Sequence, residues 1–383
     1  MHYTTAGESH GRALTAILTG VPAGITLRAE DIDRDLERRQ RGYGRGGRQT
    51  IETDRVTILS GVRFESTIGS PVSLAVTNRD WDNWTDVMSA SGAKPDNIRE
   101  THPRPGHADL AGVLKTASDD TRDVLERASA RETAARVAAG GVAKALLREL
   151  GVTVRSYVSS IGSIHMPPTP DPSAVDAEVV EASGVRCPDS QTSEAMKREI
   201  DLARADGESL GGTFYVTATG LVPGLGSYAE APERLDAELA AAVMSIPAIK
   251  GFEVGEGFHL AEIRGSQAHD PIHHIAGHGF TRPTNHAGGL EGGMTNGEPL
   301  VLRAAMKPIP TLMRPLASVD LDTLEPVDAS KERSDVCAVP AAAVVAEAEV
   351  ALVLADAYLK KFGSDALVDI VAARDAYLVR IAR

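Results

Sequence analysis

Residues 339–363, VPAAAVVAEAEVALVLADAYLKKFG, decide how this chain folds. The stretch reads as one long helix, and Pro340 falls in its first turn, where proline is tolerated. Apolar residues occupy most faces of this helix and not a single stripe. Because a helix that is apolar nearly all round must be buried, we expect it in the middle of a layered structure or against another subunit.

Shorter patterns on both sides of that stretch indicate a mixture of helices and strands. Helical spacing of apolar residues predicts helices, and strict alternation predicts strands. Ser129 and Glu132 fit a capping box at the start of the clearest of the other helices. We expect helices at 30–39, 129–150 and 232–246, and strands at 55–63, 71–77, 152–166, 211–220 and 299–309. Helices and strands do not alternate strictly, so the sequence predicts an α+β layered architecture and not a doubly wound sheet.

Composition limits the classes of function. The chain has 383 residues, enough for one large domain or two ordinary ones, and a net charge of −13. Such a surface repels nucleic acid and anionic lipid, so any bound anion needs a local basic cluster. Cys187 and Cys337 are too far apart to suggest a metal site or a disulfide framework. Without a signal-peptide pattern or an apolar run that could cross a membrane, we expect a cytoplasmic protein.

A basic, glycine-rich segment follows the first predicted helix and is the first candidate site. Within eleven residues it carries no carboxylate and five arginines, namely Arg38, Arg39, Arg41, Arg45 and Arg48. Arginine forks match the oxygens of phosphate and carboxylate groups in pairs, and glycines let the backbone approach a ligand. We therefore favour an anion site, with a solvated loop or an RNA-binding patch as alternatives. The glycines do not follow a strand, so a dinucleotide loop is disfavoured.

Two histidines lie in loops where they could meet a substrate. His10 lies in TTAGESHGRA, residues 4–13, and His107 lies in HPRPGHAD, residues 102–109. Each could be an ordinary exposed side chain, but together they are plausible proton carriers. Arg131 stands in the first turn of a predicted helix, where a cation opposes the helix dipole and needs a reason such as a bound anion.

Three further segments could contribute to a site. The glycine-rich stretch HAGGLEGGMTNGEPL, residues 286–300, suits a flat ligand lying against the backbone, and AMKPIPT, residues 305–311, follows a predicted strand. Asp335 precedes the long helix and could be only its cap. A cluster of histidines is more typical of a lid than of a metal centre, because the spacing of His269, His273, His274 and His278 fits no common site.

Taken together, these motifs resemble the chorismate synthase family. The matching pieces run in order from residue 5 to residue 342: TAGESHGRAL, GYGRGGR, RPGHADLAG, ERASARETAARVAAG, SLGG, AIKGFEVGEGF, HAGGLEGGMTNGEPL, AAMKPIPT and RSDVCAVPAA. The resemblance implies a single domain over 1–383 with a sandwich of helices between antiparallel sheets, assembled as a homotetramer. It also implies a 1,4-anti elimination of phosphate from 5-enolpyruvylshikimate 3-phosphate, with reduced FMN as cofactor.

The same resemblance implies roles for individual residues. His10 would protonate the departing phosphate, His107 would lie beside the flavin, and Asp335 would act near flavin N5. The substrate anions would be held by Ser9, Arg39, Arg45, Arg48, Ser129 and Arg131. The flavin contacts would be Ser129, Ala130, Arg131, Pro247, Ala248, Gly292, Lys307, Pro308, Ile309, Pro310, Thr311 and Arg333, of which Arg333 could instead contact substrate. No metal is implied.

Two alternatives for function remain at this point. A bifunctional enzyme would reduce its own flavin with NADPH, but the chain has no separate dinucleotide motif. We therefore expect the single-function bacterial type, with NADPH serving only indirectly through an external flavin reductase. A nucleic-acid-binding protein is disfavoured by the net charge of −13 and by the absence of interleaved aromatic residues.

Overall fold

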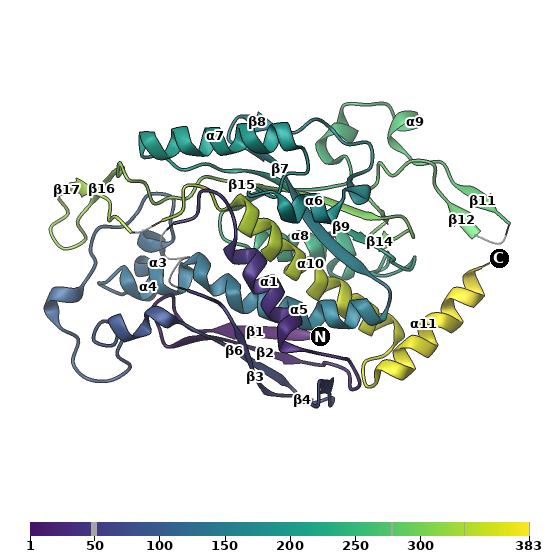
Figure 1. Ribbon diagram of the computed structural model, residues 1–383, viewed down its shortest axis with the longest axis horizontal. Coiled ribbons are helices and arrows are strands. Elements are labelled where there is room, and N and C mark those ends of the chain that lie inside the picture. The colour runs from purple at the N-terminus through teal and green to yellow at the C-terminus, as the bar shows by residue number, and fades with distance from the viewer. Residues whose placement is uncertain (47–51, 277–278, 333, 383) are drawn as a thin grey trace.

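The expected long helix is the centre of the molecule. In the computed structural model, which describes residues 1–46, 52–276, 279–332 and 334–382, it forms α10, Val339–Phe362, with Pro340 in its first turn. Nearly all of its side chains are buried, which confirms the expectation from its apolar faces. Figure 1 shows α10 crossing the middle of the molecule, with sheet strands on both sides.

One antiparallel sheet lies on the amino-terminal side of the molecule. Its strands follow the order β1-β2-β6-β3 and are β1 His2–Ala6, β2 Ala13–Thr19, β6 Val72–Thr77 and β3 Val56–Ser60. Leu14, Leu18 and Leu74 point from β2 and β6 into the core. Helix α5, Thr133–Glu149, packs on β2 and β6, and α1, Ala29–Gln40, packs against α5.

A second antiparallel sheet covers the other side of α10. Its order is β10-β15-β9-β7-β8, with bounds β10 Ile249–Val254, β15 Leu300–Met306, β9 Gly212–Thr219, β7 Thr153–Ile161 and β8 Ile164–His165. Helix α10 packs directly on β7 and β9, while α8, Leu235–Met244, packs on α10 and β10. The mixed α+β class with antiparallel sheets is therefore confirmed.

A glycine allows the two central helices to approach each other closely. A Cβ added at Gly140 of α5 would lie 2.3 Å from the Cβ of Ala348 in α10, closer than two carbon atoms can pack. Gly141 meets Ile32 of α1 in the same way, at 2.8 Å from Cγ1. The small residues that make the 129–150 pattern look helical thus also set the spacing of α1, α5 and α10.

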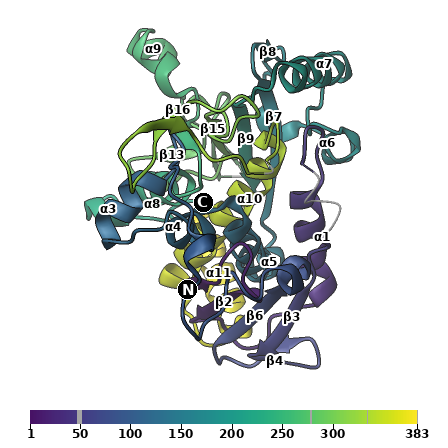
Figure 2. The ribbon, with the colours of Figure 1, turned by 90° about the vertical axis from the view of Figure 1, so that its left-hand side faces the viewer.

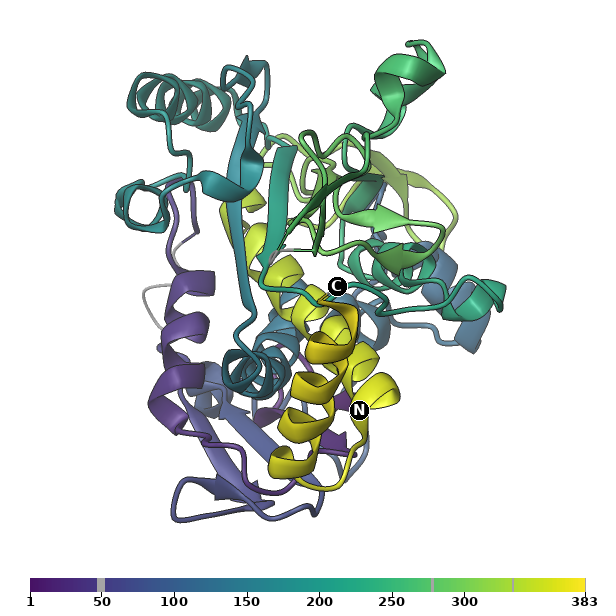
Figure 3. The same ribbon diagram turned by 90° about the vertical axis from the view of Figure 1, so that its right-hand side faces the viewer.

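Several boundaries differ from the sequence patterns for local reasons. The helix expected to begin at 129 begins at Thr133, because Ala130–Glu132 form a separate 3-10 turn. The strand expected over 152–166 bends back after Ile161 into the β7–β8 hairpin. The helices not anticipated are α3 Asp109–Thr116, α4 Arg122–Ala128, α6 Ala177–Ala182, α7 Ser190–Asp206, α9 Gly265–Ala268 and α11 Leu367–Ile381. Figure 3 shows α11 lying beside the carboxyl end of α10.

Short two-stranded pairings complete the structure. They join β4 Val62–Arg63 to β5 Ser66–Thr67, β11 His273–Ile275 to β12 Gly279–Thr281, β13 Leu290–Glu291 to β14 Met294–Thr295, and β16 Ala317–Val319 to β17 Pro326–Asp328. Figure 2 shows the β16–β17 hairpin above α3 and α4. Among the described residues, none of the helices combines the length and apolarity that crossing a bilayer requires.

A buried carboxylate on α10 holds the surrounding elements together. Glu347 is fully buried and accepts hydrogen bonds from Arg38 of α1 at 2.7 Å, Lys144 of α5 at 2.8 Å and Ser156 of β7 at 2.6 Å. Burial alone would raise the pKa of Glu347, but the charges of Arg38 and Lys144 hold that pKa well below the usual carboxyl range. Arg38 is therefore a structural cation and does not face a ligand.

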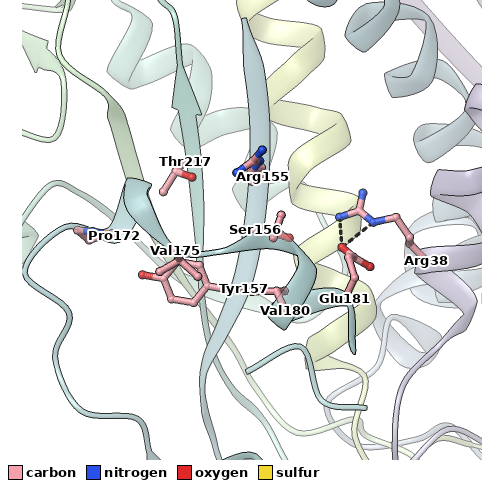
Figure 4. Close-up of a pocket in the computed structure, with 10 residues that line it drawn as sticks. Arg38, Arg155, Ser156, Tyr157, Pro172, Val175, Val180, Glu181 and Thr217 are labelled. Carbon is pink, nitrogen blue, oxygen red and sulfur yellow. Dashed lines mark hydrogen bonds and ion pairs between the residues drawn. The ribbon is translucent and has the colours of Figure 1, made fainter. Parts of the chain in front are cut away.

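The nearest cavity to this network is small. Figure 4 shows Arg38 paired with Glu181 at the edge of a cavity of about 30 Å³, with Ser156 and Tyr157 on its wall. That volume has room for about one water molecule. The cavity is thus a packing detail beside the ionic network and too small for a substrate.

Removing the buried carboxylate is expected to destabilise the fold. Glu347→Ala leaves the charges of Arg38 and Lys144 without their main partner inside the core. Breaking a buried ion pair in this way costs about 3 kcal/mol or more of unfolding free energy. Urea unfolding of the variant measures the loss. Glu149→Ala, at the exposed end of α5, is the control and should change the unfolding free energy by less than about 0.5 kcal/mol.

The same carboxylate makes stability depend on pH in a defined direction. The folded-state pKa of Glu347 lies below its usual value of 4.5, so its stabilisation is present above pH 4.5 and is lost as the pH falls through the lowered pKa. Glu347→Gln removes this dependence. The difference in unfolding free energy between wild type and Glu347→Gln should therefore shrink as the pH is lowered from 6 toward 3. A constant difference over that range would contradict the assignment.

Candidate active site

The loop between β1 and β2 presents His10 to a buried carboxylate. Glu126 of α4 accepts two hydrogen bonds from this residue, one from the backbone N–H at 2.8 Å and one from ring Nδ1 at 2.8 Å. Trp84 stacks on the imidazole face, with ring centroids 3.8 Å apart. The imidazole is 12% exposed, so it is held on its sides but still reachable from outside.

The partner of His10 is ionised in the folded protein. Burial would raise the pKa of Glu126, but hydrogen bonds and charge from His10, together with Arg122, lower it overall. Arg122 donates to Glu126 Oε1 at 3.1 Å and lies over the Trp84 ring at 5.2 Å. A carboxylate at Nδ1 fixes the proton on that nitrogen and leaves Nε2 as the atom that can exchange a proton with a ligand.

His107 is held in the same manner by a different carboxylate. Its Nδ1 lies 2.5 Å from Asp109 Oδ1, and Asp109 is fully buried. Arg104 donates to Asp109 through Nε at 2.8 Å and to Thr311 Oγ1 at 3.1 Å. Burial would raise the pKa of Asp109, but His107 and Arg104 hold it far below the usual range. Both candidate histidines thus present Nε2.

Buried arginines gather around a second buried aspartate. Arg131 donates from Nη1 to both oxygens of Asp54, at 2.6 and 2.8 Å, and Arg39 reaches the same carboxylate at 3.4 Å. Burial, offset in part by Asp54 and reinforced by Arg131 and Arg45, lowers the pKa of Arg39 to about 10. Glu52 also pairs with Arg131, at 3.7 Å, so two buried guanidiniums and two buried carboxylates meet here. The ion pair with Asp54 explains in part why a cation, Arg131, stands in the first turn of the predicted helix.

Asp335 does not cap the long helix. The residue before α10 is Ala338, and no side chain caps that helix end. Instead, Asp335 accepts a hydrogen bond from the Gly46 backbone at 2.6 Å and pairs with Arg45 at 2.9 Å. Of the two interpretations of Asp335 from sequence, the cap is therefore wrong.

The segment before α10 and a buried asparagine connect these clusters. Ser330 donates to the His102 carbonyl, Glu332 pairs with Arg122 at 3.4 Å, and Asp335 meets Arg45. Asn78 accepts from Arg131 Nε at 2.9 Å and donates to the carbonyl of Gly11, beside His10. Ser9 and Ser129 share a hydrogen bond of 3.1 Å. Hydrogen bonds and ion pairs thus connect the surroundings of His10 with Arg131, and the segment 330–335 contacts residues near both histidines.

The proposed flavin contacts are brought together only in part. Lys307 donates from its backbone to Ala248 at 2.9 Å and from Nζ to the Gly106 carbonyl at 2.7 Å, next to His107. Burial and the charge of Lys250 lower the pKa of Lys307. Ile309 accepts from Ser209 at 2.6 Å. Pro247, Pro308 and Pro310 belong to the same two segments, 247–248 and 307–311.

The remaining predicted contacts lie elsewhere or outside the described residues. Gly292 is in the turn of the β13–β14 hairpin with a φ of +60°, in a different segment from Lys307 and Ser129. Arg48 and Arg333 fall outside the described residues, as does His278. Of the other histidines in that region, His273 and His274 belong to the β11–β12 hairpin. Within the described ranges no group of side chains could hold a metal ion.

A larger hollow is lined by His269 of the predicted lid and by Ala287 and Glu291 of the candidate segment 286–300, but, among the described residues, by none of those assigned to substrate or flavin. It has a volume of about 390 Å³ and is lined by Leu260, Ile263, His269, Asp270 and Ile272 among others. Asp270 is occupied by Thr284, His286 and Ala287. The hollow has no arginine in its described lining, so the candidate site remains the one that contains the predicted arginines and His10 and His107.

Sequence reasoning missed the carboxylates that hold the site. Asp109 could have been found, since it follows His107 by two positions. Glu126 and Asp54 gave no local signal, because their partners His10 and Arg131 are 116 and 77 positions away. Trp84 and Asn78 were missed for the same reason.

Enlarging one glycine should disturb the contact between the arginine-rich segment and Asp335. An Ala Cβ at Gly46 would lie 2.8 Å from the Ser334 carbonyl oxygen, which is backbone and cannot turn away. We expect Gly46→Ala to lower the unfolding free energy by about 1–3 kcal/mol, the usual cost of overpacking. Gly265→Ala is the matched control, because its nearest neighbour is 3.9 Å away. Equal urea midpoints for the two variants would contradict the close contact.

Comparisons with known proteins identify the family. The chorismate synthase family model matches residues 1–359. The chain is 55% identical over 385 residues to chorismate synthase of Desulforudis audaxviator (strain MP104C), covering 100% of this chain and 98% of that one. It is 56% identical over 379 residues to the enzyme of Rubrobacter xylanophilus (strain DSM 9941 / JCM 11954 / NBRC 16129 / PRD-1), covering 99% and 97%. A crystal structure of chorismate synthase superposes with a TM-score of 0.81 at 42% identity, covering 100% and 98%. The chain belongs to the chorismate synthase family, lyases that remove phosphate from 5-enolpyruvylshikimate 3-phosphate.

Proposed function

We propose that this chain forms chorismate from 5-enolpyruvylshikimate 3-phosphate at the surface that carries His10, Arg131 and His107. One observation carries the proposal. Nε of Arg45 is buried and, among the described residues, has no hydrogen-bond partner, while Nη2 of Arg131 has no hydrogen bond there and only an ion pair of 3.7 Å with Glu52. A buried guanidinium nitrogen without an acceptor is costly, so these donors are matched to the oxygens of an anionic ligand.

The substrate supplies such oxygens in its phosphate and two carboxylates. Arg39, Arg45 and Arg131 are less than a tenth exposed in their side chains, which strengthens their attraction for an anion. Ser9 and Ser129 would add hydroxyl contacts beside them. Arg48 would join this set by its place in the arginine-rich segment.

His10 is proposed to protonate the departing phosphate. The reaction is a 1,4-elimination. It breaks the carbon–oxygen bond to phosphate at the first carbon of a four-carbon unit and a carbon–hydrogen bond at the fourth, and the ring gains one double bond overall. Phosphate leaves more readily when a proton or a cation neutralises its developing charge. Nε2 of His10 is the ring nitrogen that is not engaged by Glu126, so the proton would pass from that atom.

The residues around His107 fit a flat, anionic cofactor such as FMN. Lys307 supplies a cation, Thr311 a hydroxyl, and Gly106 a surface without a side chain, since a Cβ there would lie 3.3 Å from Lys307 Nζ. When bound, reduced FMN supplies electron density to the breaking bond and recovers it afterwards. His107 would stabilise that group through Nε2, and Asp335, oriented by Arg45, would keep the acceptor of the ring proton in place.

Further flavin contacts are proposed from the family resemblance. They are Ser129, Ala130, Arg131, Pro247, Ala248, Gly292, Lys307, Pro308, Ile309, Pro310, Thr311 and Arg333. The hydrogen bond between Lys307 and Ala248 supports grouping the two segments that carry most of them. The single domain, the layered sandwich and the homotetramer are proposed on the same basis, and the packing of α5 and α10 between the sheets supports the sandwich. A cytoplasmic location stays a prediction.

Turnover is expected only with flavin that has been reduced beforehand. The assay is anaerobic and follows chorismate appearing from 5-enolpyruvylshikimate 3-phosphate. One sample contains dithionite-reduced FMN, and the other contains oxidised FMN with NADPH. Turnover in the first alone supports a single-function enzyme that relies on an external reductase. Turnover in both would show flavin reduction by the chain itself, and turnover in neither, with folded protein, would reject the proposed function.

Loss of the His10 imidazole should slow the reaction without unfolding the protein. We expect His10→Ala to reduce kcat by roughly 10²-fold or more, the scale of a proton-transfer group. His165→Ala is the matched control, because His165 is exposed on β8 and outside the site. Near-normal kcat in His10→Ala would remove this residue from the proposed mechanism.

A further inference from the structure

His10 is fixed by contacts from residues outside its own loop. Its ring is stacked on Trp84 at an interplanar angle of 22°, and its backbone and Nδ1 both bond to one carboxylate group. Trp84 is itself tied down, since its indole N–H donates to Asp80 at 3.1 Å. Such a clamp determines both the position and the orientation of the imidazole.

We propose that Glu126 is the positioning residue for His10, and that Trp84 is the wall against which the imidazole is held. This inference rests on the proposed function of His10 as proton donor. Neither residue touches the reacting atoms in this arrangement. Their effect is to keep the proton on Nδ1 during the whole cycle, so that Nε2 alone exchanges a proton with the departing phosphate.

The two-point contact explains why a glutamate at position 126 can do this. Oε2 binds the His10 backbone and Oε1 binds the ring, so rotation of the ring would break a bond that the buried carboxylate cannot replace with water. The carboxylate side chain is only 2% exposed. A flipped ring would leave Oε1 with Arg122 as its donor but without the bond from His10, which disfavours the flipped ring and the other tautomer.

Arg122 contacts both Glu126 and Trp84, the two residues that hold the His10 imidazole. It bonds to Glu126 at 3.1 Å and to Glu332 at 3.4 Å, and its guanidinium lies over Trp84. Together with His10, the cation lowers the pKa of Glu126, and it contacts the same indole ring that stacks on His10. One residue therefore supports both parts of the clamp.

In the proposed proton transfer, His10 donates the proton on Nε2 and keeps the proton on Nδ1. The proton on Nε2 of the imidazolium passes to a phosphate oxygen as the carbon–oxygen bond breaks, and the bond's electron pair leaves with the phosphate. His10 is left neutral, with its remaining proton on Nδ1 facing Glu126. The substrate's carbon–hydrogen bond releases one proton to solvent in the same turnover, and one proton from solvent returns to Nε2, so no net hydroxide is formed. Since Nδ1 never loses its proton, Glu126 stabilises the charged and neutral forms in one orientation.

Glu126→Gln tests the proposal, because an amide keeps the size of the side chain but can turn its NH₂ toward Nδ1. We expect kcat to fall by about 10- to 100-fold with KM changed less than about threefold. In a His10→Ala background the same substitution should have almost no further effect on kcat, since the two residues act as one unit. Glu126→Asp should recover part of the loss. Glu349→Gln, a buried glutamate of equal 2% exposure on α10, is the control and should leave kcat nearly unchanged.

Nitrogen-15 NMR of labelled histidine measures which ring nitrogen of His10 carries the proton, and it does not require turnover. For His10 in wild type we expect the neutral form to carry its proton on Nδ1, and in Glu126→Gln we expect a mixture or the Nε2 form. Trp84→Phe should keep the wild-type pattern, whereas Trp84→Leu should broaden or shift it. If wild type proves inactive, these spectra still test the clamp, so failure of the two proposals can be told apart. A wild-type tautomer pattern in Glu126→Gln, or an equal kcat loss with and without His10, would overturn the inference.

Discussion

The rest of the structure depends on the ionised carboxylate of Glu347, one of two buried glutamates on α10. Glu347 of α10 pairs with cations from α1 and α5 and with Arg186, and it also accepts a hydrogen bond from Ser156 of β7. Arg38 supplies one of them and so fixes the rotation of α1 about its axis. With Arg38 turned toward the core, its neighbour Arg39 is turned toward Asp54 and the candidate site. The buried ion pairs of Arg38 thus help to orient Arg39, which we propose as a substrate-binding residue.

The segment that leads into α10 also positions Asp335 of the candidate site. The segment before α10 runs against the arginine-rich loop, where the Gly44 carbonyl accepts from the backbone of Val336 at 2.8 Å. A Cβ at Gly44 would lie 2.9 Å from Ile200 and 3.4 Å from Cys337, so only glycine fits this approach. The contact sets Asp335 beside Arg45. An acidic protein therefore gathers its cations at one place by anchoring each of them to a rigid element.

Sequence patterns predicted what depends on periodicity and on local chemistry. The burial of 339–363 followed from its apolar faces, and His10, His107 and the arginines followed from unusual residues in loops. What could not be predicted depends on contacts between distant positions. Arg38 and Arg39 look alike in sequence, yet one is structural and the other faces the site, because the helix turns them to opposite partners. Glu126 and Asp54 have no signature except the side chains that they meet in the folded chain.

His10 and His107 are each held at Nδ1 by a buried carboxylate. Arg45 and Arg131 each keep a buried guanidinium nitrogen that, among the described residues, makes no hydrogen bond. The most direct test of this arrangement is a crystal structure with 5-enolpyruvylshikimate 3-phosphate and oxidised FMN bound. We predict that the substrate anions contact Arg131 and Arg45, with His10 Nε2 within hydrogen-bond distance of a phosphate oxygen. A substrate bound away from these three side chains would contradict the assignment of the site.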